Sequence, residues 1–234
     1  MNSLSRRSFL SGAAALGVAS GAGSAAEGQL VWNTADWKVE DFHTLVHHPA
    51  RVKQVYDVVH INQGKFLNNV KNSLNGLEFG FGVPRQEIMI AVAMHGPANL
   101  MNYDDFIWNK YRIGEWLKVS DPETGKPAVR NIFVNSTKAA GKDFHAGDPS
   151  LDGTMFQDTS METLRSRGVQ FMSCHTATEE QAGALIRARG LTQSPEEITR
   201  EMQSHKIEGT LVVAAMVAAI ALLQTDGHYT YITV

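Results

Sequence analysis

Cysteine is the scarcest reactive residue of this chain, because Cys174 is the only one among 234 residues. A single cysteine excludes an intramolecular disulfide. If the chain reaches an oxidising compartment, this thiol must be buried, reserved for chemistry or paired with another chain.

Long hydrophobic runs and an excess of positive charge are also missing. The apolar run Leu211–Leu223 is well short of the ~20 residues that a membrane-spanning helix needs. A formal net charge of −3 argues against nucleic acids or anionic membrane surfaces as partners. We find no phosphate-binding loop and no Ser-His-Asp arrangement. Residues 79–82 (FGFG) follow a predicted helix, so they lack the context of a dinucleotide-binding motif.

Residues 1–26 have the pattern of a twin-arginine signal peptide. Residues 5–10 contain the arginine pair, a mildly apolar stretch follows, and Ser24 and Ala26 occupy the −3 and −1 positions of a cleavage site. We therefore expect an exported, periplasmic protein without stable membrane insertion. Cleavage would leave 208 residues, the size of one domain, and would change the formal charge from −3 to −5 because two arginines are removed.

Residues 27–53 are predicted to form an N-terminal arm with one or two helical turns. His43 and His47 stand four residues apart, which on a helix places both on one face, as a metal pair requires. No third ligand follows nearby in the sequence, so solvated or packing histidines are the other interpretation. We expect no metal and no cofactor.

Residues 54–234 alternate between strand and helix patterns. The almost continuous apolar run Ile88–Met94 is typical of a strand buried on both faces of a parallel sheet. Repeated strand–helix units predict one α/β domain, with a mostly parallel sheet of about five strands and helices on both faces. The expected strands cover 55–61, 88–94, 169–173, 210–213 and 229–234, and the expected helices cover 66–77, 98–117, 176–189, 195–205 and 214–224.

A long connection over about residues 118–160 interrupts this alternation. It is polar and contains several glycines and prolines. Loops of this length inside a compact domain are usually functional lids or interaction surfaces. Ordinary disorder is the rival interpretation, and the sequence favours neither.

Cys174 stands where a predicted strand ends and a predicted helix begins. Thr176 and Glu179 have the spacing of a helix capping box. A thiol at this junction would face the unpaired amide N–H groups and the positive dipole end of the helix, which favour the nucleophilic thiolate. Alternatively, Cys174 is a buried apolar filler, which is the usual role of a lone cysteine.

Three predicted strands end in residues that are capable of chemistry. Ligands of open parallel α/β sheets bind beyond the carboxyl ends of the strands, so we predict one shared pocket at that edge. A histidine beside the cysteine would stabilise a thiolate. The predicted catalytic residues are Cys174, His175 and His95, and the predicted binding residues are His60, Asn62, Gly96 and Asn99.

These segments resemble the DsrE/DsrF-like family, small α/β proteins of the YchN-like fold that include sulfur-relay subunits. The resemblance is distributed over residues 54–234, apart from the connection at 118–160. The matching stretches are His60-Ile61-Asn62-Gln63-Gly64, Val92–Gly96, Val169–Cys174, Arg187–Leu191 and Thr210–Val234.

The resemblance implies that Cys174 accepts sulfane sulfur as a persulfide and hands it to the next protein. It also implies a homo-oligomer, either a trimer or a hexamer. Relay members usually work in the cytoplasm, whereas this chain is predicted to be exported. Because there is no second cysteine to resolve a persulfide, transfer would be to another protein or to a small thiol.

Three hypotheses follow. The leading one is a periplasmic protein that carries sulfane sulfur on Cys174 and works with a sulfur donor or acceptor protein. The second is a non-catalytic ligand-binding or assembly module of the same fold. The third is a metal-binding protein that uses its histidines, with Cys174 as a further ligand.

Overall fold

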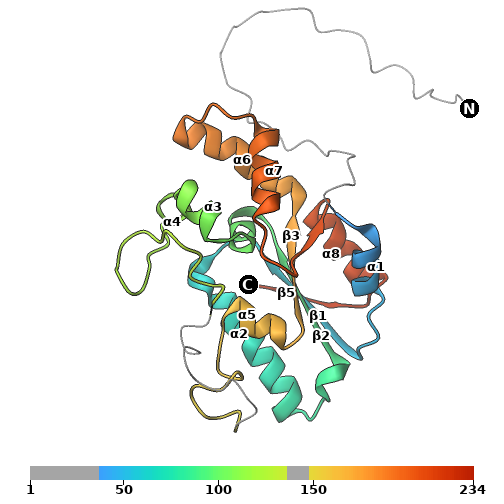
Figure 1. The fold of residues 1–234 in the computed structure, drawn as a ribbon. Helices are drawn as coiled ribbons and strands as arrows, with labels where there is room; N and C mark the ends of the chain where they lie inside the picture. The colour runs from blue at the N-terminus through green and yellow to red at the C-terminus, as the bar shows by residue number, and fades with distance from the viewer. Residues whose placement is uncertain (1–36, 136–147) are drawn as a thin grey trace, which may run out of the picture.

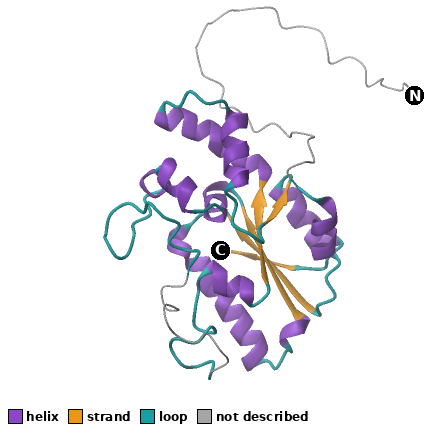
Figure 2. Ribbon diagram, in the orientation of Figure 1, coloured by secondary structure: helices purple, strands orange, loops and turns teal. Residues whose placement is uncertain are grey.

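The computed structural model describes residues 37–135 and 148–234, so the predicted signal peptide lies outside the described residues. The described chain forms one five-stranded sheet with the strand order β4-β3-β2-β1-β5, and every neighbouring pair is parallel (Figure 2). The predicted α/β class is confirmed. The strands are β1 (Val52–Val58), β2 (Ile88–Met94), β3 (Val169–Cys174), β4 (Leu211–Val213) and β5 (Thr230–Thr233).

Helices cover both faces of the sheet (Figure 1). One face carries α1 (Val39–Val46), which lies in the predicted N-terminal arm, and α8 (Met216–Thr225). The described residues contain no helix that is both long and apolar enough to cross a membrane. The opposite face carries α2 (Lys65–Asn75), α3 (Asp105–Lys110), α4 (Ile113–Trp116), α5 (Met161–Ser166), α6 (His175–Arg189) and α7 (Pro195–Ser204). Short helical turns are η2 (Asn62–Gly64), η3 (Gly76–Gly80), η4 (Arg85–Glu87) and η5 (Gly96–Asn102).

Each face of the sheet has its own hydrophobic cluster. Side chains alternate along β1, so Tyr56 and Val58 enter the larger cluster beneath α2 and α3, whereas Val55 enters the smaller cluster beneath α1 and α8. β2 lies at the centre of the sheet and is buried along its whole length, as its apolar run predicts. Cys174 belongs to the smaller cluster.

The connections between strands change face at one place in the sheet. From β1 to β4 each crossover passes over the face that carries α2, α5 and α6, and each new strand is added on the same side. The connection from β4 to β5 passes through α8 on the opposite face and returns to the edge beside β1. Right-handed crossovers require this change when the direction of strand addition reverses. The chain therefore leaves the neighbouring strands β3 and β4 toward opposite faces.

The single helix predicted over residues 98–117 is wrong. That segment contains part of η5 and then the separate helices α3 and α4. Tyr103 is extended and fully buried, and Asp104 caps α3 by accepting two backbone hydrogen bonds. Arg112 has a left-handed φ of 50° between α3 and α4. Burial of an aromatic side chain and local capping therefore override the helical periodicity.

The described parts of the 118–160 connection pack against the domain on the face opposite to Cys174. Val119, Ala128 and Phe133 are buried in the larger cluster. The Asn131 amide donates hydrogen bonds to two backbone carbonyls of the η5 region, each at 2.8 Å. Residues 136–147 lie outside the described residues. The segment 119–135 is therefore part of the folded domain.

Candidate functional site

Cys174 ends β3 and caps the helix that follows. Its backbone is extended, and its Sγ accepts a hydrogen bond from the Ala177 N–H at 3.4 Å. The thiol thus takes the place of the side-chain oxygen that usually caps a helix. The capping box predicted from Thr176 is wrong, because α6 begins at His175 and the Thr176 hydroxyl donates to the carbonyl of Ala214 at 2.9 Å.

A second helix directs an amide at the same sulfur. The N–H of Met216, the first residue of α8, donates to Cys174 Sγ at 3.3 Å. Since α6 and α8 start from neighbouring strands and run over opposite faces, the sulfur lies at the topological switch point of the sheet. Ligand sites of open α/β sheets form at such points. The two helix N-termini also favour negative charge there.

The sulfur is nevertheless enclosed by protein. Cys174 is 5% exposed and shares the smaller cluster with Met172, Val213 and Met216. Burial raises the pKa of the Cys174 thiol, and the backbone N–H groups of Ala177 and Met216 oppose this only in part. The expectation that the thiolate is favoured is therefore wrong for the resting protein. The amide donors are in place, but desolvation outweighs them.

Asn99 fixes the backbone on which Cys174 stands. Its Oδ1 accepts hydrogen bonds from the Cys174 N–H at 3.0 Å and from the Ser173 hydroxyl at 2.9 Å. Its Nδ2 donates to Thr178 Oγ1 and Gln181 Oε1, both at 3.1 Å. Because Asn99 is fully buried, we assign it a positioning role rather than contact with a ligand.

His95 directly follows β2, the strand that neighbours β3. Met94 pairs with Ser173, so the alternation of side chains assigns the residues that follow, His95 and Cys174, to the same face of the sheet. Gly96 turns the chain away with a φ of 51°, and its carbonyl accepts a side-chain hydrogen bond from α6. Two of the three predicted strand ends thus belong to the neighbouring strands β2 and β3.

Asp57 orients His95 and was missed by the sequence analysis. Its Oδ1 lies 2.7 Å from His95 Nε2, and its other carboxylate oxygen accepts a hydrogen bond from the Tyr231 hydroxyl. Pairing Nε2 with a carboxylate places the proton of the neutral ring on Nε2 and leaves Nδ1 as the basic nitrogen. The sequence does contain a signal for Asp57, which is the one acidic residue of β1.

The His175 side chain contacts Trp37 and Glu179. The residue is 3% exposed, and its ring packs edge-on against Trp37 with 5.2 Å between the centroids. Its Nδ1 lies 3.8 Å from Glu179 Oε2, one helical turn further along α6. These contacts hold the start of α6 against the segment that leads into α1.

His60 and Asn62 lie outside the Cys174 site. They line a separate cavity of about 220 Å³ together with Lys65, Phe66 and Asn69. These last three residues belong to α2, which packs on the face opposite to Cys174. The first predicted strand end thus lines a cavity that includes neither of the other two.

The histidine pair of the N-terminal arm forms a contact between rings. His43 and His47 have their ring centroids 6.4 Å apart. Within residues 37–135 and 148–234, no group of three or more His, Cys, Asp or Glu side chains is arranged to hold a metal ion.

Comparison of this chain with protein-family models, with curated proteins and with solved structures found no match. The site combines a buried thiol, two amide donors and an imidazole–carboxylate pair.

Proposed function

We propose that this chain is an exported sulfur-handling protein that carries sulfane sulfur on Cys174. The main support is the convergence of two helix N-termini on one sulfur atom, since the N–H groups of Ala177 and Met216 both donate to Sγ. Such donors fit a sulfur that becomes negatively charged during a reaction, as a thiolate or a persulfide. The resemblance to the DsrE/DsrF-like family supports the same residue.

The thiol must first lose its proton, because burial raises its pKa. We assign His95 as the base, since it is the neighbour of Cys174 in register on the same face of the sheet. Asp57 would stabilise the imidazolium that forms, and Tyr231 positions Asp57. Three strands thus contribute to the activation of one thiol.

Transfer of sulfane sulfur from a donor to Cys174 needs no oxidant. The thiol proton moves to His95, and the thiolate attacks the outer sulfur of a sulfane donor such as thiosulfate. A new S–S bond forms on Cys174 while the S–S bond of the donor breaks and sulfite leaves. An acceptor thiol then removes the outer sulfur and restores Cys174.

Intact-mass measurement tests this function. Mature protein incubated with thiosulfate should gain the mass of one sulfur atom, and Cys174→Ser should gain nothing. His60→Ala is the matched control, because it removes a strand-end histidine that lines a separate cavity and should leave the addition unchanged. Wild type without added sulfur, or Cys174→Ser with the same addition as wild type, would contradict the proposal.

The proposal also includes export by the twin-arginine route and assembly as a trimer or hexamer. Fractionation of cells that express the full chain tests export. Light scattering of the mature protein tests assembly, and a monomer would contradict the family-based expectation of an oligomer.

One observation favours the second hypothesis, a non-catalytic module, because only 5% of Cys174 is exposed. In that case a small thiol reagent reacts only when the domain opens, and the labelling rate increases steeply with denaturant. A sulfur carrier instead reacts with thiosulfate under native conditions, without added denaturant.

A further inference from the structure

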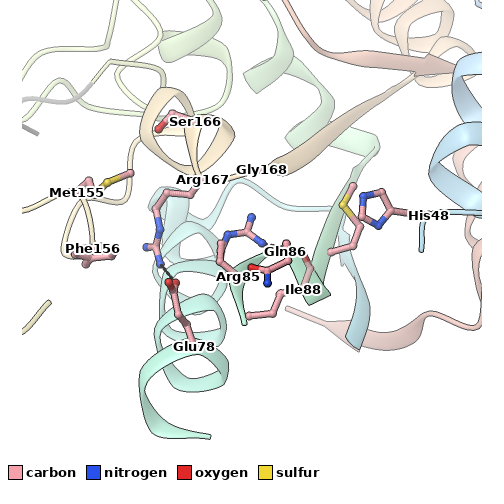
Figure 3. A pocket seen from close by; sticks show the side chains of 11 residues that line it. His48, Glu78, Arg85, Gln86, Ile88, Met155, Phe156, Ser166, Arg167 and Gly168 are labelled. Atoms are coloured by element: carbon pink, nitrogen blue, oxygen red, sulfur yellow. Dashed lines mark hydrogen bonds and ion pairs between the residues drawn. The ribbon is translucent and has the colours of Figure 1, made fainter. Parts of the chain in front are cut away.

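A larger cavity lies at the amino-terminal ends of β2 and β3, at the opposite end of the strands from Cys174 (Figure 3). Its volume of about 590 Å³ is within the range of small-molecule sites. Two arginines, Arg85 and Arg167, line it together with one acid, Glu78. No part of this cavity belongs to the proposed Cys174 chemistry.

Arg167 is a buried guanidinium with unused hydrogen-bond donors. Its Nη2 donates to Asn75 Oδ1 at 2.8 Å and lies 3.8 Å from a Glu78 carboxylate oxygen. The residue is 4% exposed, and its Nε and Nη1 have no hydrogen-bond partner within the described residues. The guanidinium lies 5.1 Å from the centroid of the Phe156 ring, and burial lowers the pKa of Arg167 to about 10. Unpaired buried donors are unfavourable and rare in folded proteins.

Arg85 adds a second guanidinium to the same cavity. Its Nη1 donates to the Ile88 carbonyl at 2.7 Å, and its charge further lowers the pKa of Arg167. A Cβ at Gly168 would lie 2.5 Å from Arg85 Nη2, so glycine is what gives this side chain room. Glu78 is the acid that acts on both arginines. Two positive charges therefore share one carboxylate, which leaves an excess of positive charge.

The other end of the cavity offers a neutral donor. The His48 Nδ1 accepts the Ala50 N–H at 3.2 Å, so the ring proton is on Nε2. Burial lowers the pKa of His48, which keeps the ring neutral. Figure 3 shows Arg85 between Arg167 and His48. The apolar part of the lining comes from Ile88, Met89, Met155 and Phe156.

From these contacts we infer a second binding site, for a small organic anion whose oxyanion group is held by Arg85 and Arg167. The anion supplies the negative charge that two guanidiniums sharing one carboxylate lack. Guanidinium groups bind phosphate and carboxylate through paired N–H donors, which makes arginine well suited to this role. The apolar part of the ligand would lie against Phe156 and the methionines.

Calorimetric titration of the mature chain with phenyl phosphate tests the inference. We expect saturable binding to wild type, weaker binding of inorganic phosphate, and about tenfold weaker binding of phenyl phosphate to Arg85→Gln. Arg51→Gln is the matched control. It makes the same change in charge, but Arg51 is exposed, pairs with Glu87 at 2.7 Å and does not line the cavity.

The outcomes separate this inference from the proposed function. Cys174→Ser should bind phenyl phosphate as wild type does, because the two sites lie at opposite ends of the strands. The inference is overturned if wild type shows no saturable binding, or if Arg51→Gln weakens binding as much as Arg85→Gln. Circular dichroism of Arg85→Gln shows whether a loss of binding reflects a loss of fold.

Discussion

The carboxyl-end edge of the sheet, at Cys174, differs from the amino-end edge, at Arg167, in what its hydrogen-bond donors contact. Around Cys174 the backbone N–H and the sulfur have partners within the protein: Asn99 accepts from the cysteine N–H, and two amides donate to the sulfur. At the opposite edge, Arg167 is buried with donors that lack partners in the described chain. The first edge is arranged to hold one of its own atoms in place. The second has two guanidinium groups and one carboxylate, and this excess of positive charge suits the binding of an anion.

Removing Asn99 should give the largest effect, because the Asn99 side chain holds several partners at once. Asn99→Ala leaves the Cys174 N–H, Ser173, Thr178 and Gln181 without their buried partner. We expect a loss of about 3 kcal/mol in the free energy of unfolding, measured by urea denaturation. Asn68→Ala, at an exposed position of α2, should change stability by less than about 0.5 kcal/mol. Equal losses in the two variants would show that the Asn99 network is not what stabilises this edge.

The next test concerns His95. If it is the base, His95→Ala should slow sulfur transfer from thiosulfate about a hundredfold near neutral pH. The deficit should shrink as the pH rises, because the thiol then ionises without help. His60→Ala should react at the wild-type rate, since His60 lines a separate cavity. A pH-independent deficit in His95→Ala would indicate a structural role instead.

A smaller effect is expected in the pH dependence of the thiol. Only the thiolate reacts with alkylating reagents, and burial raises the pKa of Cys174 above its ordinary value of 9.0. The labelling rate of native protein should therefore rise about tenfold per pH unit and continue to rise past pH 9. The urea-unfolded chain provides the reference, and its rate should level off at lower pH. A native rate that levels off first would mean that the amide donors outweigh burial.

The smallest effect should come from Arg85. Arg85→Gln removes one hydrogen bond to Ile88 but also relieves repulsion from Arg167. We therefore expect the free energy of unfolding to change by less than about 1 kcal/mol, measured by urea denaturation. A much larger loss would mean that Arg85 serves the fold, and would weaken the contrast between the two edges.

Local sequence patterns predicted those helices and strands that form from the properties of neighbouring residues. The apolar run Ile88–Met94 forms β2, and the helix expected over 195–205 is α7, which starts with a complete Ser194–Glu197 capping box. The break at Arg112 could not be predicted, because it depends on how the preceding aromatic residues pack.

The site was predictable only in part for the same reason. The sequence indicates that Cys174 ends a strand, but its raised pKa depends on burial beneath α8, which is a property of the tertiary structure. The pair of Asp57 and Tyr231 depends on which strand the last crossover returns to. The cavity joins Arg85 to Arg167 across two strand–helix units, and no sequence spacing encodes that proximity.

The bond between Tyr231 and Asp57 links the first strand of the sheet to the last one made. A nascent chain that had reached only the end of α8 would hold four of the five strands, yet one side of β1 would remain unpaired and Asp57 would lack its phenol partner. The imidazole–carboxylate pair therefore reaches its final arrangement only when synthesis has passed β5.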